Sequence, residues 1–195
     1  MEKNQTKIIL VTPGKTYFGT VKKPNFQVRT SDLLNNPNLF PSHHSQNREE
    51  NSLTLYKVTE LIDGRIPYKT HDQRDIVISK ILFFYDEYES LGNATERERI
   101  MRILNQQNKL KPEPEKLVNL ATSIHGDSFY EITGKFFGRF KQIMKQNFIS
   151  LTNVKVEKIT IDSKKGELSK LPYEIPNSFL AVNTRHIESY IVKSI

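Results

Sequence analysis

The longest uninterrupted apolar run in this 195-residue chain is five residues long, at positions 81–85. A helix needs about 20 apolar residues to cross a membrane, so this run excludes a helical span. Short apolar runs bounded by turn residues are typical of β-strands. The hydrophobic content of 36% and the aromatic content of 10% are too high for a disordered chain. We therefore expect a soluble, strand-rich protein. Because no apolar signal core follows Met1, we expect it in the cytoplasm.

Several segments combine β-branched or aromatic residues with flanking turn residues. The segments at 7–11 and 16–21 flank a Pro-Gly turn and predict a hairpin. The strongly apolar segment 75–85 predicts a central strand. The expected strands are residues 7–11, 16–21, 53–58, 75–85, 129–134, 148–161 and 178–192.

Two helices are expected in the middle of the chain. Residues 95–98 fit a capping box and precede apolar residues at helical spacing. Pro112 and Pro114 suit the start of a second helix. The apolar face of that helix would consist of Leu117, Leu120, Ala121 and Ile124. The helical pair spans about 94–126, and residues 37–51 read as an exposed loop insertion.

Two pairs of segments echo each other and indicate an imperfect internal repeat. Residues 16–21 match residues 135–140, and residues 76–81 match residues 149–154. The matches are short, so chance similarity competes with true duplication. The favoured fold is α+β: a single domain, 1–195, built as a small antiparallel β-barrel or two half-barrels. The first β unit covers about 1–90 and the second about 128–195, with the two-helix insertion between them.

Four segments together resemble an uncharacterised small β-barrel module of bacteria whose shape is similar to that of Sm-like barrels. They are residues 15–21, 29–35, 148–156 and 179–187. The resemblance implies a barrel and a binding or scaffolding role, and none of the matching residues is catalytic. The long middle insertion departs from the compact pattern of that module.

The formal net charge of +7 is unevenly distributed along the chain. Residues 49–115 carry 13 acidic and 10 basic side chains, whereas the two flanking parts together carry 19 basic and 9 acidic ones. If the ends fold together, their shared positive field attracts polyanions or acidic partners. The alternative is that the lysines only keep a β-rich protein soluble.

The segment 135–145, KFFGRFKQIMK, alternates aromatic and basic residues. Cations neutralise phosphates and aromatic rings stack on bases, so the segment fits a single-stranded nucleic-acid surface. The alternative is a helix on which Phe136, Phe137 and Phe140 form a core stripe. The candidate basic-aromatic face comprises Lys22, Lys23, Lys135, Arg139, Lys141, Lys145 and Arg185.

Motifs for catalysis and for cofactor binding are missing from the sequence. The chain has no cysteine, and it lacks GxxxxGK[ST], GxGxxG and GxSxG patterns. The adjacent His43 and His44 would point to opposite sides of an extended chain, which is poor geometry for one metal. The acidic group Asp86, Glu87 and Glu89 reads as a solvated sheet edge. We therefore expect no metal, no cofactor and no enzymatic activity.

The function expected from the sequence is that of a non-enzymatic binding or adaptor module of a bacterial cytoplasmic protein. Its partner would be another protein, bound through exposed β edges. One alternative is binding of single-stranded RNA or another nucleic acid through the basic-aromatic face. The other alternative is an enzyme with no recognisable motif.

Overall fold

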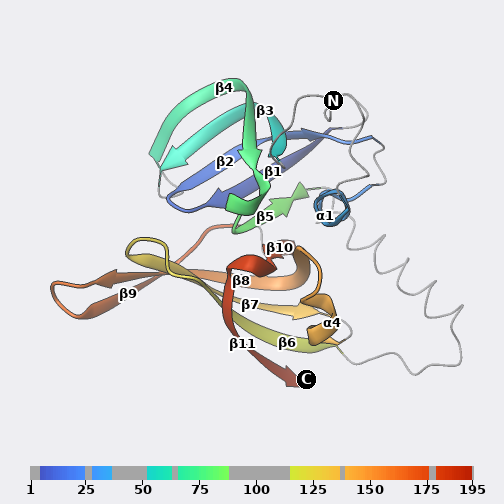
Figure 1. Cartoon of the computed structure of the whole chain (residues 1–195). Helices are drawn as coiled ribbons and strands as arrows, with labels where there is room; N and C mark the ends of the chain where they lie inside the picture. Colours follow the sequence, from blue (N-terminus) through green and yellow to red (C-terminus); the bar gives the residue numbers. More distant parts are fainter. Residues whose placement is uncertain are drawn as a thin grey trace, which may run out of the picture.

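The computed structural model describes residues 5–24, 28–36, 52–62, 66–87, 115–136, 139–175 and 179–194. Over these ranges the protein is mostly β, and eleven strands form one antiparallel sheet (Figure 1). Two short α-helices, α1 (Thr30–Asn35) and α4 (Phe140–Ile143), accompany the sheet. Within the same ranges, no helix is long and apolar enough to cross a membrane.

Five strands form the N-terminal half of the sheet. They are β1 (Gln5–Thr12), β2 (Lys15–Lys22), β3 (Ser52–Ile62), β4 (Ile66–Val77) and β5 (Phe83–Asp86). A 3-10 turn, η3 (Ile78–Lys80), separates β4 from β5. In space the five strands lie in the order β5-β1-β2-β3-β4.

The other six strands form the C-terminal half. They are β6 (Lys116–Thr122), β7 (Ser128–Phe136), β8 (Phe148–Asp162), β9 (Glu167–Pro172), β10 (Phe179–Asn183) and β11 (Ile187–Ser194). Their order is β11-β6-β7-β8-β10, with β9 paired to β8. A 3-10 turn, η4 (Thr184–His186), separates β10 from β11. If β9, which pairs only with β8, is left out of the count, each half has five strands, β1–β5 and β6, β7, β8, β10 and β11. Both halves then have the same spatial order, with the fifth strand beside the first and the fourth strand at the opposite end.

Gly19 in β2 and Gly134 in β7 occupy the same place in the two halves. Each lies where the pairing with the third strand shifts, because a bulge interrupts the register. A Cβ on Gly19 would lie 3.1 Å from the Tyr56 carbonyl oxygen, and one on Gly134 would lie 3.0 Å from Leu151 Cβ. Both positions therefore require glycine for the same reason, the close approach of the third strand.

The third strands carry a matching irregularity. Lys57 in β3 and Asn153 in β8 both have a φ of 50°, a left-handed conformation that is uncommon for residues other than glycine. Together with the shared strand order and the two 3-10 turns, these features relate the halves residue by residue. The segments matched in the sequence were wrong, however. Residues 16–21 lie in β2, whereas 135–136 end β7 and Phe140 begins α4. Residues 76–80 are the end of β4 and η3, whereas 149–154 lie in β8.

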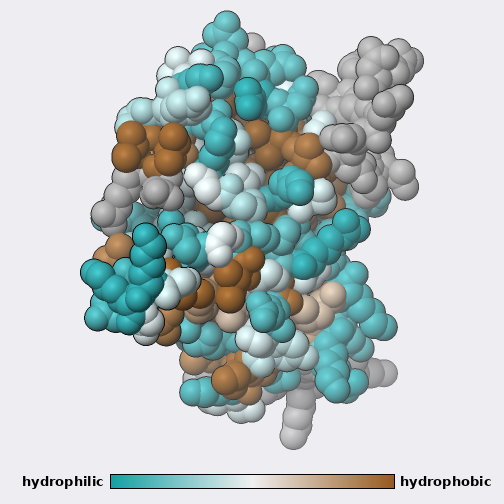
Figure 2. Space-filling model, turned by 60° about the vertical axis from the view of Figure 1, so that its left-hand side comes forward, coloured by the Kyte–Doolittle hydropathy of each residue, from teal (hydrophilic) through white to brown (hydrophobic). Residues whose placement is uncertain are grey.

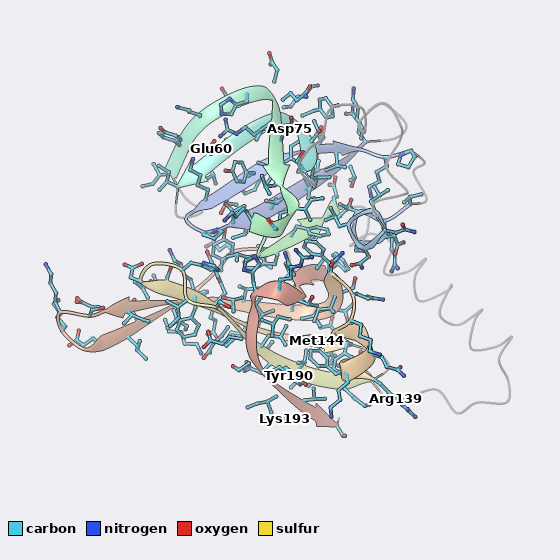
Figure 3. The ribbon with its side chains drawn as sticks, in the orientation of Figure 1. Glu60, Asp75, Arg139, Met144, Tyr190 and Lys193 are labelled. Atoms are coloured by element: carbon cyan, nitrogen blue, oxygen red, sulfur yellow. The ribbon has the colours of Figure 1, made fainter. Side chains whose placement is uncertain are left out.

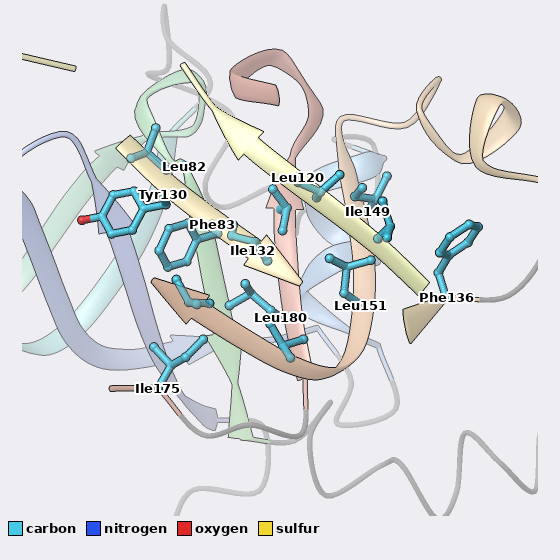
Figure 4. Close-up of a cluster of buried hydrophobic side chains, with 14 of the residues drawn as sticks. Leu82, Phe83, Leu120, Tyr130, Ile132, Phe136, Ile149, Leu151, Ile175 and Leu180 are labelled. Carbon is cyan, nitrogen blue, oxygen red and sulfur yellow. The ribbon is translucent and has the colours of Figure 1, made fainter. Parts of the chain in front are cut away.

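The two halves join where β5 pairs with β10, with Ala181 opposite Phe84 and Val182 opposite Phe83. Neighbouring residues of these strands point into different cores, because successive side chains of a strand alternate between faces. Phe83 belongs to the core shown in Figure 4, whereas Phe84 belongs to a second core nearer the N-terminal half. Both faces of the junction are buried, which explains the continuous apolar sequence of its strands.

The expected fold class was wrong. The sheet is open rather than closed into a barrel, and the protein is mostly β rather than α+β. Of the second expected helix, residues 116–122 form β6, which pairs with β7 and β11. Buried Val118 and Leu120 alternate with exposed Asn119, and the same stretch also fits helical spacing, so the pattern was ambiguous. The first expected helix and the loop 37–51 lie outside the described residues.

The central strand expected at 75–85 was also wrong. Its residues divide into the end of β4, the 3-10 turn η3 and the beginning of β5. The apolar run at 81–85 reflects the two-sided burial of β5 and not a longer strand.

Candidate functional site

The β5–β10 junction provides the reference for how this sheet joins two edges. Phe83, Phe84, Ala181 and Val182 are each 0% exposed. Asn183 adds two hydrogen bonds: its backbone N–H donates to the Leu82 carbonyl at 2.9 Å and its side chain donates to the Ile81 carbonyl at 2.8 Å. Apolar burial on both faces and backbone pairing together hold the junction.

Helix α1 extends this junction beyond the two strands. The Asn35 side chain donates to the Phe148 carbonyl at 2.9 Å and accepts from the Phe148 N–H at 2.7 Å. Leu34 and Phe148 share the core that contains Phe84. The short helix of the N-terminal half therefore contacts the third strand of the C-terminal half.

Strands β11 and β4 form the two ends of the sheet, and among the described strands each is paired on one side only. Tyr190, Ile191 and Val192 follow one another in β11 and are 42%, 63% and 37% exposed. Consecutive apolar residues present apolar groups on both faces of a strand. Apolar residues on both faces are typical of a strand inside a sheet, whereas β11 has a neighbour on one edge only among the described strands.

The β4 edge is more polar than the β11 edge. Ile66 and Tyr68 are 63% and 50% exposed near its beginning, and charged residues follow toward its end. Asp75 accepts a hydrogen bond from the Thr54 hydroxyl of β3 at 2.6 Å. Figure 3 places Asp75 on β4 and Tyr190 and Lys193 on β11, at opposite ends of the molecule. Figure 2 shows that apolar patches interrupt an otherwise hydrophilic face.

A buried polar cluster fixes the end of β5. The Lys23 ammonium lies 3.0 Å from the Asp86 carboxylate, with the two side chains 2% and 0% exposed. Asp86 also accepts hydrogen bonds from the Thr6 hydroxyl at 2.9 Å and from the Thr30 hydroxyl at the start of α1. Lys23 is therefore part of the interior and not of a basic surface, and Asp86 is not a solvated edge residue.

The remaining candidate basic residues are divided between the two halves. Lys22 lies in β2 with its ammonium 4.4 Å from the centroid of the Tyr56 ring. Lys135 forms a 2.9 Å ion pair with Glu115. Four others are exposed: Arg139, Lys141 and Lys145 at and after the start of α4, and Arg185 in η4. Only the three near α4 come from one short stretch of chain.

The aromatic residues of the same stretch are buried. Phe136 is 3% and Phe140 is 6% exposed, and their rings lie 5.0 Å apart in the core of the C-terminal half. Phe140 also contacts Tyr190 of β11, with ring centroids 4.7 Å apart. The core interpretation of these two phenylalanines is confirmed, although the helix there comprises only Phe140–Ile143. Phe137 lies outside the described residues.

Glu60 forms the second buried carboxylate site. It is 1% exposed and accepts a hydrogen bond from the Lys15 ammonium, and His71 Nε2 lies 3.6 Å from its other oxygen. Burial raises the pKa of Glu60, but the hydrogen bond and charge of Lys15 outweigh it and lower that pKa below its ordinary value. The same hydrogen bond raises the pKa of Lys15. The arrangement is a structural ion pair across β2, β3 and β4.

A hollow of about 120 Å³ lies between the β1–β2 turn and the β6–β7 connection. His125, Asp127, Ser128 and Lys158 line its C-terminal side. Burial, together with His186 at a ring distance of 5.3 Å, lowers the pKa of His125. The backbone groups of His125 and Ser128 are hydrogen-bonded to each other at this side of the hollow. Within the described ranges, no three His, Asp or Glu side chains are placed to hold a metal.

Comparisons with known proteins found no matching family model, no matching curated protein and no matching solved structure.

Sequence reasoning placed interaction at β edges in general but did not identify which edges are open. A signal for an interaction edge was present in residues 190–192. Three consecutive apolar residues there differ from the alternation of apolar and polar residues that is typical of a half-exposed strand. Strand order was required to use that signal, since it decides which strands lie at the ends of the sheet.

Proposed function

We propose that the protein is a non-enzymatic binding module that takes up an extended segment of a protein partner at the open ends of its sheet. The observation that carries this proposal is β11, which is apolar on both faces and paired on one side only among the described strands. A partner strand would supply the missing backbone hydrogen bonds and cover the apolar side chains.

The chemistry of the edge restricts the partner. Ile191 and Tyr190 point to opposite faces of β11, so a bound segment needs apolar or aliphatic side-chain surface on both of its faces. Lys193 near the end of the strand favours an acidic residue opposite it. An extended segment whose side chains offer aliphatic surface on both faces, with an acidic residue placed opposite Lys193, meets these requirements.

The test uses tagged full-length protein in nuclease-treated cell extract. Ile191→Lys places a charge on the edge, where charged residues discourage strand addition, and Lys165→Glu in the β8–β9 turn serves as a charge-changing control away from β11. We expect wild type and Lys165→Glu to retain the same protein, cross-linked to β11, and Ile191→Lys to lose it. Retention of that protein by Ile191→Lys at wild-type yield refutes the proposal.

Nucleic-acid binding remains a second candidate because Arg139, Lys141 and Lys145 are exposed within seven residues. Burial of Phe136 and Phe140 leaves this surface with charge but without the stacking those two rings would supply. Binding of a labelled single-stranded RNA should then weaken steeply between low and moderate salt. Glutamate at all three positions should abolish it, and salt-independent or absent binding removes this candidate.

A further inference from the structure

The order of strands in the sheet shows how one half is joined to the other. Each half has a fifth strand at one end and a fourth strand at the other, and the junction pairs the fourth strand of the C-terminal half, β10, with the fifth strand of the N-terminal half, β5. The two strands left at the ends are a fourth strand, β4, and a fifth strand, β11. One molecule therefore presents both sides of a second junction of the same kind.

We infer that the partner bound at these ends is a second copy of this chain, attached head to tail, with β11 of one copy antiparallel to β4 of the next. The inference rests on the proposed function of the edges and names their partner. The β5–β10 junction inside one molecule then serves as the structural template for the β11–β4 junction between two copies.

The template defines a register. In the internal junction Phe84 lies opposite Ala181, and Phe83 lies opposite Val182. Phe84 pairs with Leu10 of β1 as Tyr190 pairs with Leu120 of β6, so Tyr190 is the counterpart of Phe84. Comparing the residues that lie opposite in the neighbouring strands gives the other counterparts. Phe83 corresponds to Ser189, Ala181 to Asp75, and Val182 to Ile76. Between copies, Tyr190 thus lies opposite Asp75 and Ser189 opposite Ile76.

This register also matches charges. Antiparallel pairing that places Tyr190 opposite Asp75 places Lys193 opposite Asp72 three residues further along. Both side chains are exposed, and directly opposite residues of an antiparallel pair share a face. A shift of one residue would place Lys193 opposite His71 or Gln73 and would turn the edge side chains to the other face. The same register places Arg74 opposite Ile191 and Gln73 opposite Val192, where the aliphatic stem of the arginine would lie along the isoleucine. The Lys193–Asp72 pair therefore supports the register obtained from the template, and Ile191 meets a side-chain stem there.

Helix α4 provides a further parallel. It lies between the second and third strands of its half, as α1 does, and α1 contacts the third strand across the internal junction through Asn35. Ile143 and Met144 are only partly buried beside the core of the C-terminal half, and Phe140 of the same helix contacts Tyr190 of β11. The beginning of β3 of the next copy would cover this apolar surface, just as β8 covers α1.

The interface is heterologous, because β11 of one copy meets β4 of another and the same edge is never paired with itself. Such contacts produce closed rings when the rotation between copies closes, and open filaments when it does not. In a ring every copy uses both ends, and in a filament every copy except the two terminal ones does.

The experiment measures the mass of the purified full-length protein over a concentration series by sedimentation and mass photometry. Wild type should form multiples of the monomer. Asp72→Lys and Lys193→Asp each create a like-charge pair and should weaken association about tenfold, which corresponds to ~1.4 kcal/mol. The double variant Asp72→Lys/Lys193→Asp restores opposite charges and should recover most of the association. An equimolar mixture of the two single variants should also recover it, because each contact then joins opposite charges.

Lys165→Asp is the matched control, since it removes one exposed lysine away from both edges and should associate like wild type. Circular dichroism and thermal unfolding establish that every variant folds. A monomeric wild type at all concentrations overturns the inference, and so do single variants that behave like Lys165→Asp or a double variant that is not rescued. If wild type is monomeric but Ile191→Lys still loses a different captured protein, the proposed function stands while self-association falls.

Discussion

The buried ion pair between Lys23 and Asp86 gives the sharpest test of the N-terminal half. Removing the carboxylate by Asp86→Ala leaves the Lys23 ammonium buried without this counter-charge and removes the acceptor of the Thr6 and Thr30 hydroxyls. Breaking one side of a buried pair costs about 3–5 kcal/mol. Both side chains are at most 2% exposed, so solvent does not reduce this cost appreciably.

The other half of the molecule suggests the compensating variant. In the N-terminal half, Ile8 lies between Gly19 on one side and Asp86 on the other. In the C-terminal half, Val118 lies in the same way between Gly134 and Val192. Val192 is therefore the counterpart of Asp86. Replacing an entire buried pair by apolar side chains is often neutral or stabilising. We expect Lys23→Met/Asp86→Val to recover much of the stability lost in Asp86→Ala and to remain about 1–2 kcal/mol below wild type, because Thr6 and Thr30 lose the carboxylate that accepts their hydroxyls.

The assay is urea unfolding at pH 7 followed by circular dichroism. With an m-value of about 2 kcal/mol/M, Asp86→Ala should lower the midpoint by about 1.5–2.5 M. Lys23→Met alone should cost less, because Thr6 and Thr30 still donate to the carboxylate that remains. The reasoning is refuted if Asp86→Ala lies within about 0.5 kcal/mol of wild type, or if the double variant is as unstable as Asp86→Ala.

Two further predictions concern β7 and the buried Glu60. Gly134→Ala forces a methyl group to within 3.0 Å of Leu151 Cβ and should lower the free energy of unfolding by about 1–3 kcal/mol. The control Thr133→Ala in the same strand should lower it by less than about 1 kcal/mol. Equal losses for the two variants in urea titrations would contradict the packing argument. The Glu60 pKa is lowered below 4.5 in the folded state, so its contribution to stability is complete above that pH and is lost as the pH falls through the folded pKa. Thermal unfolding from about pH 6 to pH 3 should therefore show a flatter stability profile for Glu60→Gln, and an unchanged slope would exclude this role for Glu60.

Local structure was predictable from the sequence where strands are short and bounded by turns. The hairpin at residues 7–11 and 16–21 lies within β1 and β2, and the strands expected at 129–134 and 148–161 lie within β7 and β8. The single strand expected at 178–192 was wrong, because β10, η4 and β11 divide it. Helix was expected wrongly at 117–124 because apolar residues there fit both periods, and only the neighbours β7 and β11 decide in favour of a strand. The choice between helix and strand at this segment therefore depends on pairing with strands that are distant in the sequence, and the spacing of apolar residues alone does not determine it.

Neither the open form of the sheet nor the true alignment of the two halves could be predicted from any single segment of the sequence. The repeat exists at the level of strand order, bulge position and backbone conformation, as Gly19 and Gly134 illustrate, while the side chains of the two halves differ. Short sequence matches consequently joined segments that are not counterparts. Among the site residues, Lys23 was misplaced because a lysine in an acid-free window gives no sign of a buried partner 63 positions away at Asp86.

The differences between the inner junction and the outer edges predict how strong the association between copies is. Phe83 and Ala181 at the inner junction are replaced at the ends by Ser189 and Asp75, and the side-chain hydrogen bond of Asn183 has no counterpart at Val77. The inner junction forms within one chain, where its strands are held at high effective concentration, whereas the outer edges must remain soluble before they meet. Association between copies should therefore be reversible. Dilution of the assembled protein should release monomers within a concentration series, and assemblies that persist at every dilution would contradict this argument.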